Sequence, residues 1–238
     1  MADFLLIHGA AHGAWCWRDV IPALTRRDHA ARAIDLPGHG ADPTPYQQVT
    51  LDLYAEAIID AIGANDAPVV LVGHSMGGYP ITLAAARAPH KVSRLIYLCA
   101  YVPAPGLSLA QRRIQAPRQP LLPHIRMTDD RMGWTVPDDS LDALFYHDCP
   151  PGTSAHAARH LCVQATAPTS VPLDTFPPDD LPRRYIRCAD DRTIPPEFQI
   201  TMTADWPARH VATMGCGHSP FFADPEGLAD HLIRLAQE

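Results

Sequence analysis

The sequence predicts an α/β fold in which a mostly parallel sheet is flanked by helices and carries an inserted helical cap. Short apolar runs of strand length alternate with longer helical patterns, which is typical of a parallel sheet covered by helices. The chain has 238 residues, 47% of them hydrophobic, enough to fill the core of one large domain. One long proline-rich segment interrupts the alternation, and it is too long for a structureless loop inside a compact domain.

The first hundred residues supply four of the expected strands and three of the helices. Pro37-Gly38 closes the second strand, and residues 51–62 carry apolar side chains near a helical period before Gly63 and Asn65 end the helix. Four consecutive apolar residues at 69–72 are typical of a buried central strand. We expect strands at 4–7, 30–36, 69–72 and 92–100, and helices at 20–24, 51–62 and 79–88.

The end of the chain returns to the same alternation. We expect strands at 184–189 and 209–213 and a terminal amphipathic helix at 226–236. Residues 1–101 and 182–238 are therefore predicted to form the core. Residues 102–181, which hold about half of the 25 prolines, are predicted to form an inserted cap of short helices. Such a cap would lie over the carboxyl ends of the strands, where open α/β sheets bind ligands.

Charge and hydropathy exclude several classes of partner. The formal net charge is −7, and basic residues occur only in short pairs such as Arg26-Arg27, so no nucleic-acid partner is expected. No apolar segment approaches the roughly 20 residues that span a bilayer, so no membrane partner is expected. The N-terminus lacks the basic start and long apolar stretch of a secretory signal. We therefore expect a cytoplasmic protein.

The six cysteines are scattered along the chain with no CxxC pair. In a cytoplasmic protein this distribution indicates reduced, mostly buried thiols. Metal sites need closely spaced ligands, so no metal is expected.

Residues 73–77 read Gly-His-Ser-Met-Gly and lie between an apolar strand and a helix, the context in which the G-x-S-x-G pattern holds a nucleophilic serine. Glycines on both sides let the backbone make a strained turn that lifts the Ser75 hydroxyl out of the sheet. The start of the helix places the Met76 amide where an oxyanion would form.

A serine hydroxyl needs a base to act as a nucleophile at neutral pH. Among 13 histidines, His218 lies in a glycine-rich loop after the last strand, from which an imidazole can reach a site above the sheet. The preceding strand runs into Asp190-Asp191, which places an acid at the sheet edge in the chain order Ser, Asp, His. Spacing alone does not separate Asp190 from Asp191.

The loop after the first strand, residues 8–13, reads His-Gly-Ala-Ala-His-Gly. Small residues there allow the backbone to approach a substrate carbonyl closely. We expect the Ala10 amide to complete an oxyanion hole with the Met76 amide.

These stretches resemble the methylesterase and hydroxynitrile-lyase branch of the α/β hydrolases, which includes plant methyl-salicylate and methyl-jasmonate esterases and bacterial esterases such as pyrethroid hydrolases. The resemblance lies in residues 8–17, 73–77, 185–199 and 217–218, with Phe-Tyr-His-Asp-Cys at 145–149 in the cap. It spans nearly the whole core, whereas residues 116–137 do not match.

The resemblance implies the α/β-hydrolase fold and a Ser-His-Asp triad. The aspartate of this branch is followed by basic or polar residues and then Ile-Pro, which falls on Asp191. Because the branch encloses the acyl group in an apolar pocket under the cap, the resemblance implies that His12, Trp134 and Phe221 line a substrate pocket.

Two departures from the branch bear on the chemistry. Its lyases carry a lysine directly after the catalytic histidine and a threonine after the early histidine, where this chain has Ser219 and Gly9. Cyanohydrin cleavage is therefore disfavoured.

We expect a serine carboxylic-ester hydrolase that acts on a small, largely apolar ester through an acyl-enzyme, without cofactor or metal. Two alternatives remain: a receptor on a hydrolase shell, with slow or no turnover, and a lactonase or C–C hydrolase with the same triad. The sequence determines neither the acyl and alcohol groups nor whether the protein is a monomer or a homodimer.

Overall fold

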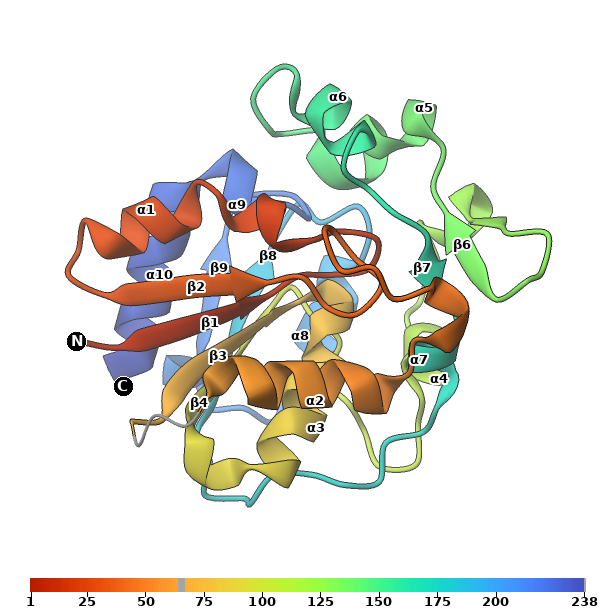
Figure 1. Cartoon of the computed structure of the whole chain (residues 1–238). Coiled ribbons are helices and arrows are strands. Elements are labelled where there is room, and N and C mark those ends of the chain that lie inside the picture. Colours follow the sequence, from red (N-terminus) through yellow and green to blue (C-terminus); the bar gives the residue numbers. More distant parts are fainter. Residues whose placement is uncertain (64–66, 238) are drawn as a thin grey trace.

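A parallel sheet of six strands runs through the centre of the molecule, in the order β2-β1-β3-β4-β8-β9 (Figure 1). The computed structural model describes residues 1–63 and 67–237. Every neighbouring pair in this sheet is parallel, so the carboxyl ends of its strands meet at one edge. The strands are β1 (Asp3–Ile7), β2 (Ala30–Ile34), β3 (Val69–His74), β4 (Val92–Leu98), β8 (Arg183–Cys188) and β9 (Val211–Met214).

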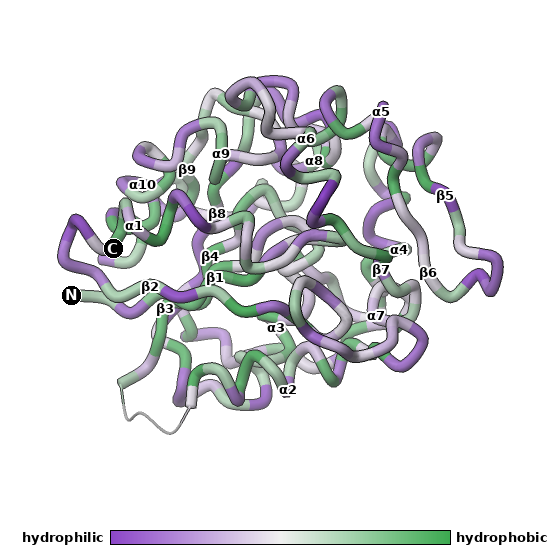
Figure 2. Tube along the Cα trace, turned by 45° about the horizontal axis from the view of Figure 1, so that its top comes forward, coloured by the Kyte–Doolittle hydropathy of each residue, from purple (hydrophilic) through white to green (hydrophobic). Residues whose placement is uncertain are grey.

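Helices cover both faces of the sheet, as Figure 1 shows. On one face α2 (Leu51–Ile62) packs against α3 (Gly78–Arg87), and on the other α1 (Val20–Thr25) packs against α10 (Pro225–Gln237). Strand β1 contributes to both cores, because Leu5 and Ile7 join the cluster under α2 and α3 while Phe4 and Leu6 join the cluster under α1 and α10. Figure 2 accordingly shows hydrophobic colouring along β1, β3 and β4 at the centre of the molecule.

Local signals in the sequence fix the ends of α2. The Thr50 hydroxyl accepts a hydrogen bond from the Leu53 amide at the start of the helix. Gly63 ends it with a φ of 77°, a conformation that glycine adopts without a steric penalty. Asn65, the other expected stop signal, lies outside the described residues.

Between β4 and β8 the chain forms short elements beyond the carboxyl ends of the strands, along the top and the right-hand side of Figure 1. The short helices are α4 (Leu109–Arg113), α5 (Asp138–Leu141), α6 (Thr153–Ala158) and α7 (Ala167–Ser170), with a turn of π-helix at Asp142–Tyr146. This segment also contains an antiparallel sheet of β5 (Arg126–Met127), β6 (Gly133–Thr135) and β7 (Gln164–Ala165).

The sequence interpretation missed this small sheet because strands of two or three residues are too short to show alternation. It also missed α8 (Pro196–Met202) and α9 (Pro220–Ala223), both of which start at prolines. The expected helix at 79–88 begins one residue earlier, at Gly78, after a turn of 3₁₀-helix at Ser75–Gly77. The main sheet matches the α/β-hydrolase prediction.

Candidate active site

Ser75 lies on a sharp turn between β3 and α3, with a φ of 53°. Side chains are strained in this region of φ, so the surrounding structure must hold the turn. The two flanking glycines allow it: a Cβ on Gly73 would lie 2.6 Å from the Gly77 carbonyl oxygen, and one on Gly77 would lie 2.9 Å from the His8 carbonyl oxygen. The G-x-S-x-G pattern is therefore required by close backbone packing as well as by the turn.

Ser75, His218 and Asp191 form a connected hydrogen-bonded chain. His218 Nε2 lies 3.1 Å from Ser75 Oγ, and His218 Nδ1 lies 2.9 Å from Asp191 Oδ2. Because a carboxylate only accepts hydrogen bonds, Nδ1 carries the proton and Nε2 faces the serine hydroxyl as the acceptor. All three residues are buried, with exposed fractions of 7%, 2% and 2%. This is the geometry that a base-activated serine needs.

The carboxylate of Asp191 is fixed by three further donors. The amides of Thr193 and Ile194 donate to Oδ1 over 2.7 and 2.9 Å, and the Gln199 side-chain amide donates to Oδ2 over 2.8 Å. The neighbouring Asp190 is exposed and accepts a hydrogen bond from His147, which lowers its pKa. The structure thus separates the two aspartates that spacing left open, and it places Asp191 beside the histidine.

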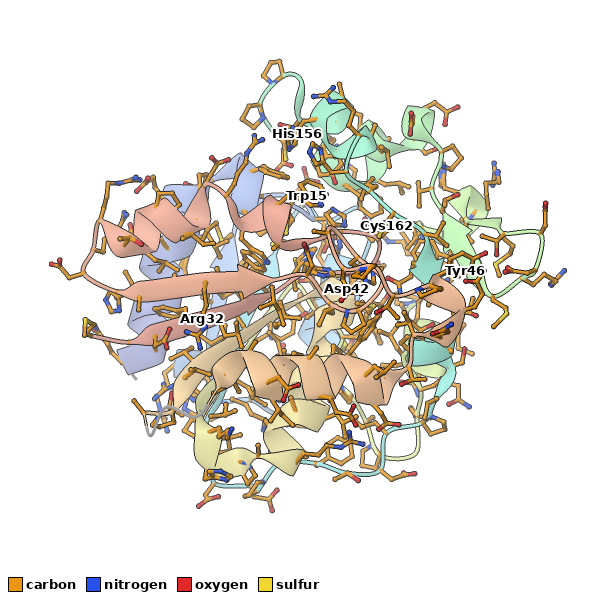
Figure 3. The ribbon with its side chains drawn as sticks, viewed as in Figure 1. Trp15, Arg32, Asp42, Tyr46, His156 and Cys162 are labelled. Carbon is orange, nitrogen blue, oxygen red and sulfur yellow. The ribbon has the colours of Figure 1, made fainter. Side chains whose placement is uncertain are left out.

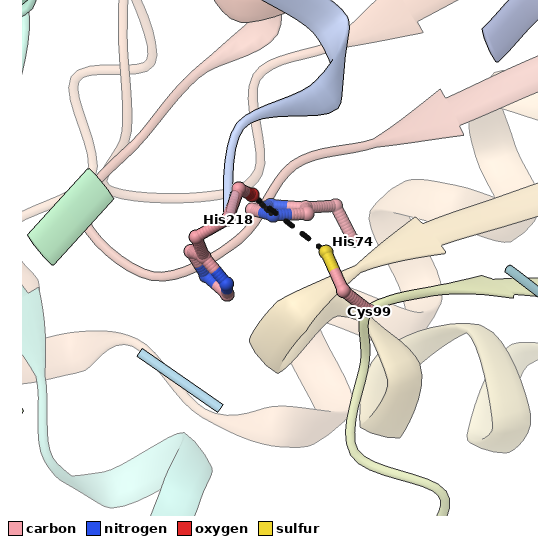
Figure 4. Close-up of side chains that lie close together, drawn as sticks. All are labelled: His74, Cys99 and His218. Atoms are coloured by element: carbon pink, nitrogen blue, oxygen red, sulfur yellow. Dashed lines mark hydrogen bonds between the residues drawn. The ribbon is translucent and has the colours of Figure 1, made fainter. Parts of the chain in front are cut away.

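The side chains of His74 and Cys99 converge on the main-chain carbonyl of His218 (Figure 4). His74 Nε2 donates to the His218 carbonyl oxygen over 2.8 Å, and the Cys99 thiol lies 3.6 Å from the same oxygen. Burial lowers the pKa of His74 well below its usual value, so this imidazole stays neutral. The two ring nitrogens of His218 are already engaged by Asp191 and Ser75. His74 and Cys99 therefore hold the loop that carries His218 in place, and the geometry of the three residues does not offer a free set of metal ligands.

The loop after β1 passes close to the Ser75 side chain. A Cβ on Gly9 would lie 2.9 Å from Ser75 Cβ and 2.7 Å from His74 Nδ1, so only glycine fits there without displacement. Ala10 and Met76, the two residues expected to supply oxyanion amides, line the same cavity as Ser75.

The segment around β7 holds this loop in place. The Ala11 amide donates to the Gln164 side-chain oxygen over 3.0 Å, and the Cys162 amide donates to the Ala11 carbonyl over 3.0 Å. Ala11 has a φ of 60°, so these two hydrogen bonds hold a strained backbone. Cys162 lies beside this loop in Figure 3. Tyr46, also labelled there, contacts the turn between β5 and β6, where the Tyr46 hydroxyl donates to Asp130 over 2.8 Å.

A cavity of about 240 Å³ opens above Ser75. Most of its lining is apolar and comes from the segment between β4 and β8. Trp134, which the resemblance placed in a substrate pocket, lies in this lining. The other members are Ala10, Ser75, Met76, Tyr101, Leu109, Ala110, Arg113, Leu121, Leu122, Ile125, Met127, Thr166, Thr169, Ser170 and Thr193.

His12 and Phe221 lie outside that lining, in contrast to the expectation from the resemblance. His12 is buried beside the oxyanion loop, where Nδ1 donates to the Ala10 carbonyl over 2.8 Å and Nε2 accepts from the Tyr146 hydroxyl over 2.7 Å. Burial lowers its pKa to about 4, so it stays neutral. Phe221 is fully buried and packs edge-on against His74, with ring centroids 5.0 Å apart. Both side chains pack against residues of the site and do not line the cavity, because hydrogen bonds engage His12 and aromatic packing buries Phe221.

Sequence reasoning missed the positioning residues Gln164 and Gln199. Both side-chain amides are buried. Gln164 bonds to the Ala11 amide, which is 153 residues away in the chain, and Gln199 bonds across the loop between β8 and α8 to Asp191. No local pattern in the sequence indicates either contact. Only Gln199 lay within a stretch that carried the family resemblance.

Among the described residues, no helix combines the length and apolar character needed to cross a membrane.

Comparison with known proteins places this site in a family. Residues 4–231 match the model of the alpha/beta hydrolase family. The chain is 30% identical to a pyrethroid hydrolase of Sphingobium wenxiniae, over 99% of this chain and 88% of that protein. It is 29% identical to methylesterase 2 of Arabidopsis thaliana, over 98% and 95% of the two chains.

Solved structures agree with these relatives. A pyrethroid hydrolase from Sphingobium faniae superposes with a TM-score of 0.85 at 28% identity, covering 99% of this chain and 97% of that one. The methylesterase MES16 from Arabidopsis gives a TM-score of 0.86 at 25% identity, covering 100% and 99%. The chain belongs to the alpha/beta hydrolase family and is an enzyme of its esterase branch.

Proposed function

We propose that this protein hydrolyses a small, largely apolar carboxylic ester, with Ser75 as nucleophile, His218 as general base and acid, and Asp191 as the residue that orients the imidazole. The observation that carries the proposal is the hydrogen-bonded chain from Ser75 through His218 to Asp191 at the floor of an apolar cavity.

The reaction proceeds in two halves that share one geometry. In the first, Ser75 Oγ attacks the ester carbonyl carbon, and its proton passes to His218 Nε2. The oxyanion accepts hydrogen bonds from the Ala10 and Met76 amides, and a single donor of this kind is typically worth about 10²–10³ in turnover. His218 then gives its proton to the departing alkoxide, which leaves as the alcohol.

The second half releases the acid. Water attacks the acyl-enzyme while His218 takes one of its protons, and collapse of the second oxyanion returns that proton to Ser75 Oγ. Ester and water are consumed, and acid and alcohol are formed. No step requires a cofactor or a metal.

Gly9, in the loop after β1, and Ser219, directly after His218, favour ester hydrolysis over cyanohydrin cleavage. Gly9 has no space for a side chain, since a Cβ there would already lie within 3 Å of two neighbours. Ser219, at the position of the lyase lysine, is fully buried and carries no charge to stabilise a cyanide leaving group.

Replacement of the nucleophile tests the proposal. Ser75→Ala should abolish hydrolysis of p-nitrophenyl acetate and labelling by a serine-reactive fluorophosphonate. Ser93→Ala is the matched control, because Ser93 lies at the start of β4, where its hydroxyl donates to the Val69 carbonyl at the opposite end of the strands. Near-normal turnover in Ser75→Ala, or labelling of another serine in the unmodified protein, would refute the mechanism.

A panel of esters, lactones and β-diketones distinguishes this reaction from the related ones. Steady turnover of simple esters with little lactone or C–C cleavage supports the proposal. A single turnover that leaves a persistent adduct would instead indicate a receptor.

A further inference from the structure

Arg113 is the one charged side chain among the described residues that line the cavity above Ser75. It ends helix α4 and is partly buried. The rest of the lining is apolar or carries hydroxyl groups, and no carboxylate occurs in it. A guanidinium group at this position is unusual, because a cavity for a neutral apolar ester gains nothing from a cation in its wall.

Within residues 1–63 and 67–237, no carboxylate lies within ion-pair distance of the Arg113 guanidinium. Its neighbours in the chain are engaged differently. Arg118 pairs with Glu197 over 2.6 Å, and Arg112 donates to the Val102 carbonyl and the Gln115 side chain. Of these three arginines, Arg113 has a guanidinium with neither an ion pair nor a hydrogen bond to the described residues, and it lines the cavity.

Tyr101 lines the cavity together with Arg113 and Ser75. The Tyr101 amide donates to the Ser75 carbonyl over 3.1 Å, and its side chain lines the same cavity. Burial raises the pKa of the Tyr101 phenol, and the nearby positive charge of Arg113 partly opposes that rise. The phenol therefore remains neutral and can donate a hydrogen bond into the cavity that Tyr101 and Arg113 both line. Several hydroxyls elsewhere in the lining are already engaged, since those of Thr169 and Ser170 donate to the Thr166 carbonyl.

We infer that the substrate is a half-ester of a dicarboxylic acid, whose free carboxylate binds Arg113 and Tyr101 while its ester carbonyl lies at Ser75. A carboxylate accepts charge-assisted hydrogen bonds from a guanidinium, which presents a fork of N–H donors. The apolar walls of the cavity would enclose the methylene chain between the two groups. The inference rests on the proposed function, and it names the acyl group that the sequence left undetermined.

The test compares monomethyl with dimethyl esters of succinic, glutaric, adipic and pimelic acids, following methanol release at about pH 8, where the free carboxylate is ionised. Because each pair has the same methylene chain, the ratio of kcat/KM for the half-ester to that for the diester isolates the effect of the charge. We expect this ratio to peak at one chain length, the one that spans Ser75 and Arg113, and to fall with added salt.

Arg113→Met should lower that ratio about tenfold at the optimal length, mainly through a higher KM for the half-ester, because partial exposure limits the strength of the ion pair. Arg113→Lys, which keeps the charge but not the fork, should restore part of the preference. Arg131→Met is the control, because this substitution removes the same charge at a position outside the cavity lining. Arg131 is exposed in the turn between β5 and β6.

The outcomes separate the two proposals. The half-ester inference is overturned if the diesters are hydrolysed, the half-ester to diester ratio of kcat/KM stays below one at every acid chain length, and Arg113→Met leaves that ratio unchanged. This outcome leaves the proposed ester hydrolysis intact. If no ester of either series is hydrolysed and the fluorophosphonate does not label Ser75, the proposed function fails and the inference fails with it.

Discussion

The buried histidines around the active site make the protein sensitive to acid. His8, His12 and His74 are at most 2% exposed, and burial lowers the pKa of His12 to about 4 and those of His8 and His74 well below their usual value. His39, also buried, has a lowered pKa for the same reason. In the unfolded chain each would bind a proton near pH 6.5, whereas in the folded protein each stays neutral to much lower pH.

Proton linkage converts this difference into stability. Since the unfolded state binds more protons below pH 6.5, the free energy of unfolding must fall as the pH decreases, by up to about 1.4 kcal/mol per pH unit for each histidine. By pH 5 His12 alone loses about 2 kcal/mol. The pKa values of His8 and His74 are lowered in the same direction, so their losses add to that of His12. The His12 loss alone is a sizeable part of the stability of a typical domain, about 5–15 kcal/mol. Full stability is expected above pH 6.5, and the loss continues as the pH falls from 6.5 to about 4, the pKa of His12 in the folded protein.

Urea denaturation at several pH values between about 7.5 and 5, followed by tryptophan fluorescence and circular dichroism, measures this loss. Most carboxylates titrate below this window, so the slope reports mainly on histidines. His12→Asn should reduce the slope by up to about 1.4 kcal/mol per pH unit, since one titrating group is removed. His90→Asn, at an exposed position, should leave it unchanged. An unfolding free energy that is constant from pH 7 to 5 would refute the reasoning.

Three further substitutions test how the site is held together. Gln199→Met should lower the free energy of unfolding by about 3 kcal/mol or more and reduce kcat, because the Asp191 carboxylate loses a donor and two buried backbone groups lose their partners; a thermal midpoint equal to that of the unmodified protein would contradict this. Gln164→Met should reduce kcat about tenfold with little change in KM, since the Ala11 amide loses its partner and the oxyanion loop loosens; pre-steady-state acylation rates measure the effect, and an unchanged rate argues against it. Gly9→Ala should lower kcat/KM at least about a hundredfold, because the added methyl group displaces the loop after β1 from Ser75. Gly215→Ala is the control, since nothing lies within 4 Å of a Cβ at that position. Equal activity of the two variants would show that the loop can move without loss of function.

The sequence determined the elements whose signals are local. The strands β1 and β3, in the interior of the sheet, are apolar runs bounded by glycine or polar residues, the pattern that is typical of strands buried on both faces of a parallel sheet. The turn at Ser75 was predictable because the requirement for glycine at position 73 comes from backbone crowding within the turn itself. The chain order of serine, aspartate and histidine then followed from the positions of these residues at the ends of predicted strands.

Tertiary structure decided what depends on contacts between distant parts of the chain. Asp191 lies beside His218, which is 27 residues further along the chain, whereas Asp190 faces solvent and bonds to His147, which is 43 residues away. His12 and Phe221 pack behind the site instead of lining the cavity because their partners come from other loops. The small sheet of β5, β6 and β7 and the position of Arg113 in the cavity wall could not be predicted from the sequence either. Strands of two or three residues have no periodicity, and no local pattern reveals which charge a folded chain leaves unpaired.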